Sequence, residues 1–236
     1  MSDLLVIVPS RGRPDNIAEL ADAWQATDAA ADLLVAVDID DSELGRYQKA
    51  FLDYYPRFQL VNGPRERLGP TLNRLAVQRA PNHFAIGFMG DDHRPRTEGW
   101  DVRMVETLRE MGTGLVYGND LFQRENLPTA VFMTSDIVRT LGYMHPPGLI
   151  HLFLDNYWLG LGQALGRIRY LDDVVIEHVH PLAKTAEWDE GYREANSQAM
   201  YARDHATFTR WVREDSQAAI AKLRAMIAAK YAPGGP

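Results

Sequence analysis

The sequence predicts an α/β domain built on an open, mostly parallel sheet flanked by helices, with a C-terminal helical extension. Short apolar runs without polar alternation recur in the first half, which is typical of strands buried on both faces. Segments with apolar residues at helical spacing separate these runs. This alternation of strand and helix implies right-handed βαβ units, and 236 residues suit one large domain.

The first half contains the clearest elements. Four expected strands cover residues 4–8, 33–37, 58–61 and 83–89. Three expected helices lie between them, over residues 14–26, 42–51 and 69–79. Pro14 suits the first turn of the first helix, and Ser42 suits the cap of the second.

The second half is more mixed. Expected helices cover residues 100–111, 137–141 and 155–165, and expected strands cover residues 114–117, 129–134, 167–171 and 174–179. The pattern is helical again from about residue 187 to residue 231. We expect a catalytic domain over residues 1–185, divided into a nucleotide-binding half (1–93) and an acceptor half (94–185). Residues 186–236 form the helical extension, which packs on the body of the domain or on a second subunit.

Composition narrows the classes of function. The chain has no cysteine, so any metal must be bound by carboxylate, imidazole, carbonyl or water. A net charge of −7 argues against broad, non-specific binding of nucleic acid. No apolar run approaches the ~20 residues that a membrane span needs, and the run from Leu4 to Val8 is too short for a signal peptide. We therefore expect a cytoplasmic protein without stable membrane insertion.

Polar clusters follow four of the expected strands. In an open α/β sheet, ligands bind at the carboxyl ends of the strands, so these clusters are the candidate site. They cover residues 10–13, 38–41, 90–93 and 178–180. Asp38 can accept hydrogen bonds from a ribose hydroxyl or a base, although a cap for the following helix is the alternative.

Asp91, Asp92 and His93 form the central cluster. Adjacent carboxylates raise each other's pKa unless a cation lies between them. Oxygen and imidazole ligands suit Mn²⁺ or Mg²⁺, which would also hold a diphosphate. We expect Asp92 and His93 to bind the metal, with His180, in preference to His178, as a third ligand. The alternative is a solvated acidic turn.

The runs from Val8 to Pro14, from Ala36 to Asp38 and from Phe88 to His93 resemble the N-terminal signatures of family-2-like GT-A glycosyltransferases. Gly69 to Asn73 resembles a further stretch near the donor of that family. The resemblance implies a GT-A fold and a nucleotide-sugar donor, with Asp91–His93 in the role of the Asp-X-Asp motif. His93 departs from the pattern, because a second acid is usual there. The residues expected at the donor are Pro9, Ser10, Arg11, Arg13, Asp38, Asn73, Asp91 and Lys184.

Asp155 is the expected catalytic base. It lies at the start of an expected helix, where the resemblance places the acid that takes the acceptor's proton in inverting enzymes; a helix cap is the alternative. We expect a metal-dependent glycosyltransferase that uses a nucleoside-diphosphate sugar, with UDP favoured. The acceptor is a hydroxyl on a glycan, small molecule, protein or modified DNA base. A sugar-phosphate nucleotidyltransferase, a non-catalytic nucleotide-sugar-binding protein and, more weakly, a metal-dependent nuclease are the alternatives.

Overall fold

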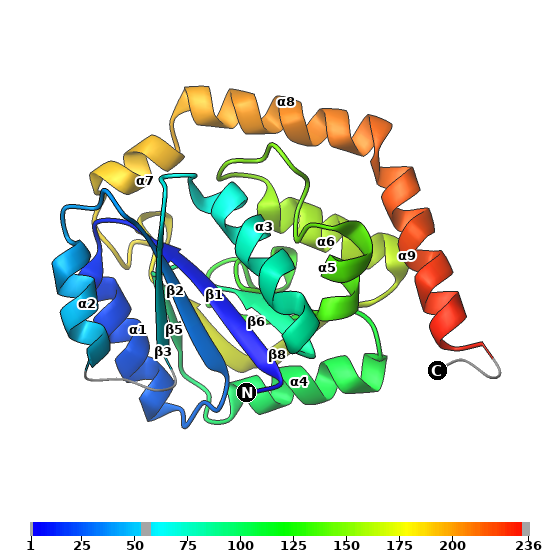
Figure 1. Ribbon diagram of the computed structural model, residues 1–236, viewed down its shortest axis with the longest axis horizontal. Coiled ribbons are helices and arrows are strands. Elements are labelled where there is room, and N and C mark those ends of the chain that lie inside the picture. The colour runs from blue at the N-terminus through cyan, green and yellow to red at the C-terminus, as the bar shows by residue number, and fades with distance from the viewer. Residues whose placement is uncertain (1, 53–57, 233–236) are drawn as a thin grey trace.

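The computed structural model describes residues 2–52 and 58–232, which form an α/β domain around one sheet (Figure 1). The sheet has eight strands within these residues, in the order β3-β2-β1-β4-β7-β6-β8-β5. The strands are β1 (Leu4–Ser10), β2 (Asp32–Asp38), β3 (Phe58–Gly63), β4 (Ala85–Phe88), β5 (His93–Pro95), β6 (Leu115–Asn119), β7 (Val131–Thr134) and β8 (Ile168–His178).

The first half of the sheet is parallel, as predicted. β1 pairs with β2 and β4, and β2 pairs with β3, all in parallel. The second half is mixed: β7 runs antiparallel to β4 and β6, β6 is parallel to β8, and β5 is antiparallel to β8. The carboxyl ends of β1, β2, β3 and β4 therefore share one edge, where the predicted polar clusters begin.

Helices cover both faces of the sheet. They are α1 (Pro14–Ala26), α2 (Leu44–Leu52), α3 (Leu68–Arg79), α4 (Trp100–Met111), α5 (Ser135–Leu141), α6 (Leu154–Leu165), α7 (Glu190–Ala195), α8 (Gln198–Glu214) and α9 (Ser216–Lys230). Short 3-10 turns cover Ala80–Asn82, Arg124–Asn126 and Pro181–Ala183. In the described residues no helix combines the length and apolar character that crossing a bilayer requires.

Two apolar cores hold the layers together, because alternate residues of β1 point to opposite faces. Leu4 and Val6 pack in the core that contains Trp24 of α1 and Trp100 of α4. These two indoles meet edge to face, with ring centroids 5.0 Å apart. Ile7 faces the other core, which residues of α3, α5, α6, α8 and α9 complete. The sheet is thus buried on both faces, which explains its unbroken apolar runs.

Three elements differ from the prediction. Residues 167–171 and 174–179, expected as two strands, form the single strand β8, whose middle carries exposed side chains at Asp172 and Asp173. The short strand β5 was not predicted, because three residues are too few for a periodic pattern. The C-terminal helical stretch is interrupted: the Ser197 hydroxyl accepts a hydrogen bond from the Met200 amide and begins α8. Residues 233–236 of the expected extension lie outside the described residues.

Candidate active site

A cleft of about 680 Å³ opens at the carboxyl-end edge of the sheet. The ends of β1 and β2 form one wall, and the start of α6 together with α7 forms the other. The cleft brings together ten of the twelve predicted site residues: Pro9, Ser10, Arg11, Arg13, Asp38, Asp91, Asp92, His93, Asp155 and His180.

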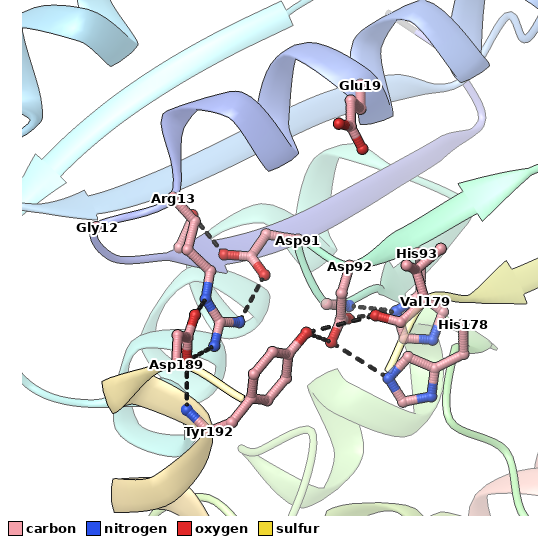
Figure 2. A network of polar contacts seen from close by, with 12 residues as sticks. Gly12, Arg13, Glu19, Asp91, Asp92, His93, His178, Val179, Asp189 and Tyr192 are labelled. Atoms are coloured by element: carbon pink, nitrogen blue, oxygen red, sulfur yellow. Dashed lines mark hydrogen bonds and ion pairs between the residues drawn. The ribbon is translucent and has the colours of Figure 1, made fainter. Parts of the chain in front are cut away.

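Arg13 connects the two walls of the cleft (Figure 2). Its Nη1 lies 3.2 Å from Asp91 Oδ1, and its Nε and Nη2 both donate to the Asp189 carboxylate at 2.7 Å. The Tyr192 ring lies under the guanidinium, 3.8 Å from Cζ to the ring centroid. The second Asp91 oxygen accepts a hydrogen bond from the Ser10 hydroxyl at 2.6 Å. Burial raises the pKa of Asp91, and the charge of Arg13 opposes that rise.

Asp92 lies beside Asp91 but has different partners. Its Oδ2 accepts a hydrogen bond from the Tyr192 hydroxyl at 2.8 Å and lies 3.3 Å from His178 Nε2. Burial acts to raise the pKa of Asp92, but hydrogen bonding and charge from His178 outweigh it, so this pKa is well below its usual value. One carboxylate of the pair is therefore held ionised by the neighbouring histidines.

Asp92, His178 and His180 form a candidate metal-binding group. Each offers one ligand atom, and these atoms lie within 4.8 Å of one another. The His180 Nδ1 accepts a hydrogen bond from the Leu182 amide at 3.2 Å, so its other ring nitrogen is the one available to a ligand. Burial lowers the pKa of His180 to about 4, which keeps the imidazole neutral. Burial also acts to lower the pKa of His178, but Asp92 outweighs it and raises that pKa.

His93 is placed differently from its predicted role as a ligand and is not part of this group. Its Nδ1 lies 3.0 Å from the Gly90 amide nitrogen, which donates to it, and 3.3 Å from Asp92 Oδ1, so this nitrogen is already engaged within the protein. Its Nε2 faces the Thr129 hydroxyl at 3.4 Å. The ring stacks on His178 with centroids 4.3 Å apart, because β5 and β8 pair with these two residues opposite each other. Both His93 and His178 thus lie 3.3 Å from Asp92, and of these two only His178, which the sequence interpretation favoured less, belongs to the candidate metal-binding group.

Asp38, the last residue of β2, lines the cleft. Arg11 lies between Asp38 and Asp40 and donates to their carboxylates at 2.8 and 2.7 Å. Burial raises the pKa of Asp38 although Arg11 opposes the change. Asp41 has a local role, because its carboxylate accepts hydrogen bonds from the Gly12 and Glu43 amides at 2.8 Å.

Asp155 lies in the first turn of α6, as predicted. Its Oδ1 accepts a hydrogen bond from the Asn156 amide at 2.9 Å. Burial raises the pKa of Asp155, which is the direction that suits a general base near neutral pH. The carboxylate lines the same cleft as the candidate metal group.

Two predicted donor residues are not among the described residues that line the cleft. The Asn73 side chain is used inside the fold: its carbonyl accepts from the Met144 and His145 amides, and its amide donates to the His145 carbonyl. Lys184 is exposed and ends the turn that begins at Pro181. Neither placement supports a direct contact with a donor, so both assignments stay predictions.

Two residues that line the cleft, Asp189 and Tyr192, were not among the predicted site residues. Asp189 caps α7, accepting from the Tyr192 amide at 2.8 Å, and at the same time binds Arg13. An aspartate directly before the first residue of a helix is a typical N-cap, so the sequence carries a local signal for this cap. No local signal identifies Arg13 as its partner, since 176 residues separate them. The segment predicted as an extension thus contributes to the cleft.

The chain resembles known proteins in structure rather than in sequence. No family model matches the sequence, and no curated protein sequence is significantly similar to it. The mannosyltransferase PcManGT from Pyrobaculum calidifontis, whose structure holds GDP-Man and Mn²⁺, is similar with a TM-score of 0.59 and 15% identity, covering 99% of this chain and 76% of that chain.

Two further structures are similar. Staphylococcus aureus TarS has a TM-score of 0.61 and 13% identity, covering 98% of this chain and 44% of that chain, so the present chain spans under half of TarS. A protein of Desulfovibrio desulfuricans G20 assigned as a nucleotide-diphospho-sugar transferase has a TM-score of 0.52 and 14% identity, covering 89% of this chain and 99% of that chain. Taken with the strand order and the cleft, these likenesses show that the chain has the GT-A fold of glycosyltransferases.

Proposed function

We propose that the chain is a metal-dependent glycosyltransferase that moves a sugar from a nucleoside-diphosphate donor to a hydroxyl of an acceptor. The observation that carries the proposal is the position of Asp92, His178 and His180. Their ligand atoms lie within 4.8 Å of one another, in a cleft that Asp38 and Asp155 also line. A diphosphate between Asp38 and this group would place its sugar in the part of the cleft that Asp155 lines.

The ligand atoms of Asp92, His178 and His180 suit a divalent cation. Asp92 supplies an ionised oxygen and His180 a neutral imidazole, because their pKa values are both lowered. His178 has a buried Nδ1 without a hydrogen-bond partner among the described residues. Two imidazoles beside one carboxylate favour Mn²⁺ over Mg²⁺, which prefers oxygen ligands. Such an ion, when bound, supplies Lewis-acid stabilisation of the departing diphosphate.

The chain's own residues perform the remaining tasks. Asp38, with Arg11 against it, offers a carboxylate to the nucleoside. Arg13 is held rigidly by Asp91 and Asp189 and brings a positive charge to the middle of the cleft, where a diphosphate would lie. Asp155 takes the proton of the attacking hydroxyl, and its raised pKa suits it to do so near neutral pH. A carboxylate base acting on the acceptor corresponds to transfer with inversion.

Calorimetric titration tests the proposal. UDP and GDP are titrated into the protein with and without Mn²⁺, and we propose UDP as the preferred nucleotide. Binding is expected to strengthen about tenfold or more with the metal, and hydrolysis of the matching nucleotide sugar is expected to require it. Asp92→Asn should abolish the metal effect. Asp173→Asn, on an exposed carboxylate of β8, is the control and should leave it intact. Binding that is the same with and without Mn²⁺ would refute metal dependence, and absence of any turnover would refute transfer.

A further inference from the structure

The loop that precedes α6 is fastened to the C-terminal helix α8 by a single buried carboxylate. Asp204 of α8 is 0% exposed. Its Oδ1 accepts a hydrogen bond from the Ile150 amide at 3.1 Å, and its Oδ2 accepts from the His151 and Leu152 amides, both at 2.8 Å. Figure 1 shows this loop reaching up to α8, ahead of α6. Three consecutive backbone donors thus depend on one side chain from a distant helix.

A second contact from α8 holds the next residue. Phe153 has a φ of +66°, a left-handed conformation that a non-glycine residue keeps only when its surroundings impose it. Its ring stacks on Phe208 and lies against Tyr201, with centroids 5.5 and 5.3 Å away. Phe153 is the residue at which the chain turns into α6. The direction in which α6 begins is therefore set by α8 on both sides of that turn.

Asp155 lies two residues beyond Phe153, in the first turn of the helix so fixed. Ile150, His151, Leu152 and Phe153 line the same cleft as Asp155. A carboxylate that acts as a base needs hydrogen-bond reach to the hydroxyl that it deprotonates, and small displacements of such groups reduce rates strongly. A group that holds the backbone immediately before the base therefore controls its position.

We propose that Asp204 is a positioning residue for Asp155, so that α8 is part of the catalytic apparatus although it contributes no group to the reaction. This inference rests on the proposed function, because it concerns the base of the transfer. In Asp204→Asn an NH₂ group replaces one carboxylate oxygen and faces an amide donor, so at least one of the three hydrogen bonds is lost. The loop keeps its attachment to α3, where the Gly69 amide donates to the Ile150 carbonyl at 2.8 Å, so the fold is expected to persist.

The test is Mn²⁺-dependent hydrolysis of a nucleotide sugar, in which water replaces the acceptor. Asp204→Asn is expected to lower kcat about tenfold or more, as misplaced catalytic groups do. The dissociation constant of the nucleoside diphosphate should change less than twofold, because Asp38 and the β1 end of the cleft are untouched. Tyr201→Ala removes only an exposed ring beside Phe153 and is expected to lower kcat about threefold, so it decides the question if Asp204→Asn does not fold.

A matched control separates positioning from general stability. Asp101 is also buried, at 3% exposure, and its Oδ2 accepts from the Ala30 and Ala31 amides at 2.8 and 2.7 Å, away from the cleft. Asp101→Ala is expected to lower stability without changing kcat. Equal kcat losses in Asp204→Asn and Asp101→Ala, or no loss in Asp204→Asn, would overturn the positioning role alone. A wild-type chain that binds no nucleoside diphosphate and hydrolyses no nucleotide sugar would overturn the proposed function and this role with it.

Discussion

Manganese binding is expected to weaken about tenfold for each pH unit on the acid side of the His178 pKa, which lies above the ordinary histidine value of about 6.5, because one imidazole proton must leave before the metal binds. Among the three candidate ligands only His178 carries a proton in that range. Its pKa is raised by Asp92, which outweighs burial, whereas the pKa of His180 is about 4 and that of Asp92 is well below its usual value. A raised pKa favours the protonated imidazole, so metal affinity must rise with pH. One proton displaced amounts to about 1.4 kcal/mol of binding free energy per pH unit.

Isothermal titration calorimetry with MnCl₂ between about pH 5 and pH 8 measures this slope, and buffers of different ionisation enthalpy count the protons released. His178→Gln should bind metal more weakly and lose the slope. His83→Gln is the control, because that histidine is buried and does not line the cleft. A wild-type affinity independent of pH, or a release of two protons per ion near pH 6, would refute this assignment of ligands.

Three substitutions test other parts of the site. Asp155→Asn should lower donor hydrolysis about 100-fold or more with nucleotide affinity unchanged, and an unchanged rate would remove Asp155 as the base. In Gly90→Ala the added Cβ would lie 2.4 Å from Asp92 Oδ1. We therefore expect the free energy of unfolding to fall by about 1–3 kcal/mol and Mn²⁺ to lose its stabilising effect in thermal melts. A rise in melting temperature with Mn²⁺ equal to that of the wild-type chain would contradict this. Arg13→Met leaves Asp91 buried without its cation and should cost about 3–5 kcal/mol near pH 8. The loss should be smaller near pH 5, because Asp91 has a raised pKa and is protonated more readily in the folded chain; equal losses in urea unfolding at both pH values would contradict it.

The positions of the strand ends could be predicted because strands buried on both faces leave unbroken apolar runs. Polar residues that interrupt such a run must then lie at its end, as Ser10, Asp38 and Asp91 do. The same reasoning fails on β8, where exposed side chains at its middle break the run although the strand continues past them.

The choice among the histidines could not be predicted. It depends on the pairing of β5 with β8, which sets His93 opposite His178, and on the separate hydrogen bond that the Gly90 amide donates to the Nδ1 of His93. Neither the three-residue strand nor its register has a periodic signal. The Tyr192 hydroxyl on Asp92 was equally hidden, because that contact spans 100 residues and arises only when α7 folds back over the sheet.

The guanidinium of Arg13 has consequences for the order in which the site can form. Arg13 is made early in synthesis, yet one of its two acid partners follows 176 residues later. A nascent chain that has folded its first parallel strands still lacks the cover that makes Asp91 and Asp92 inaccessible to water. The contacts of Asp189 with Arg13 and of Tyr192 with Asp92 cannot form until the segment that begins at Asp189 emerges, so this end of the cleft must close late. A chain shortened before Asp189 would lack the partners of Arg13 and Asp92 at α7 and could not close this end of the cleft.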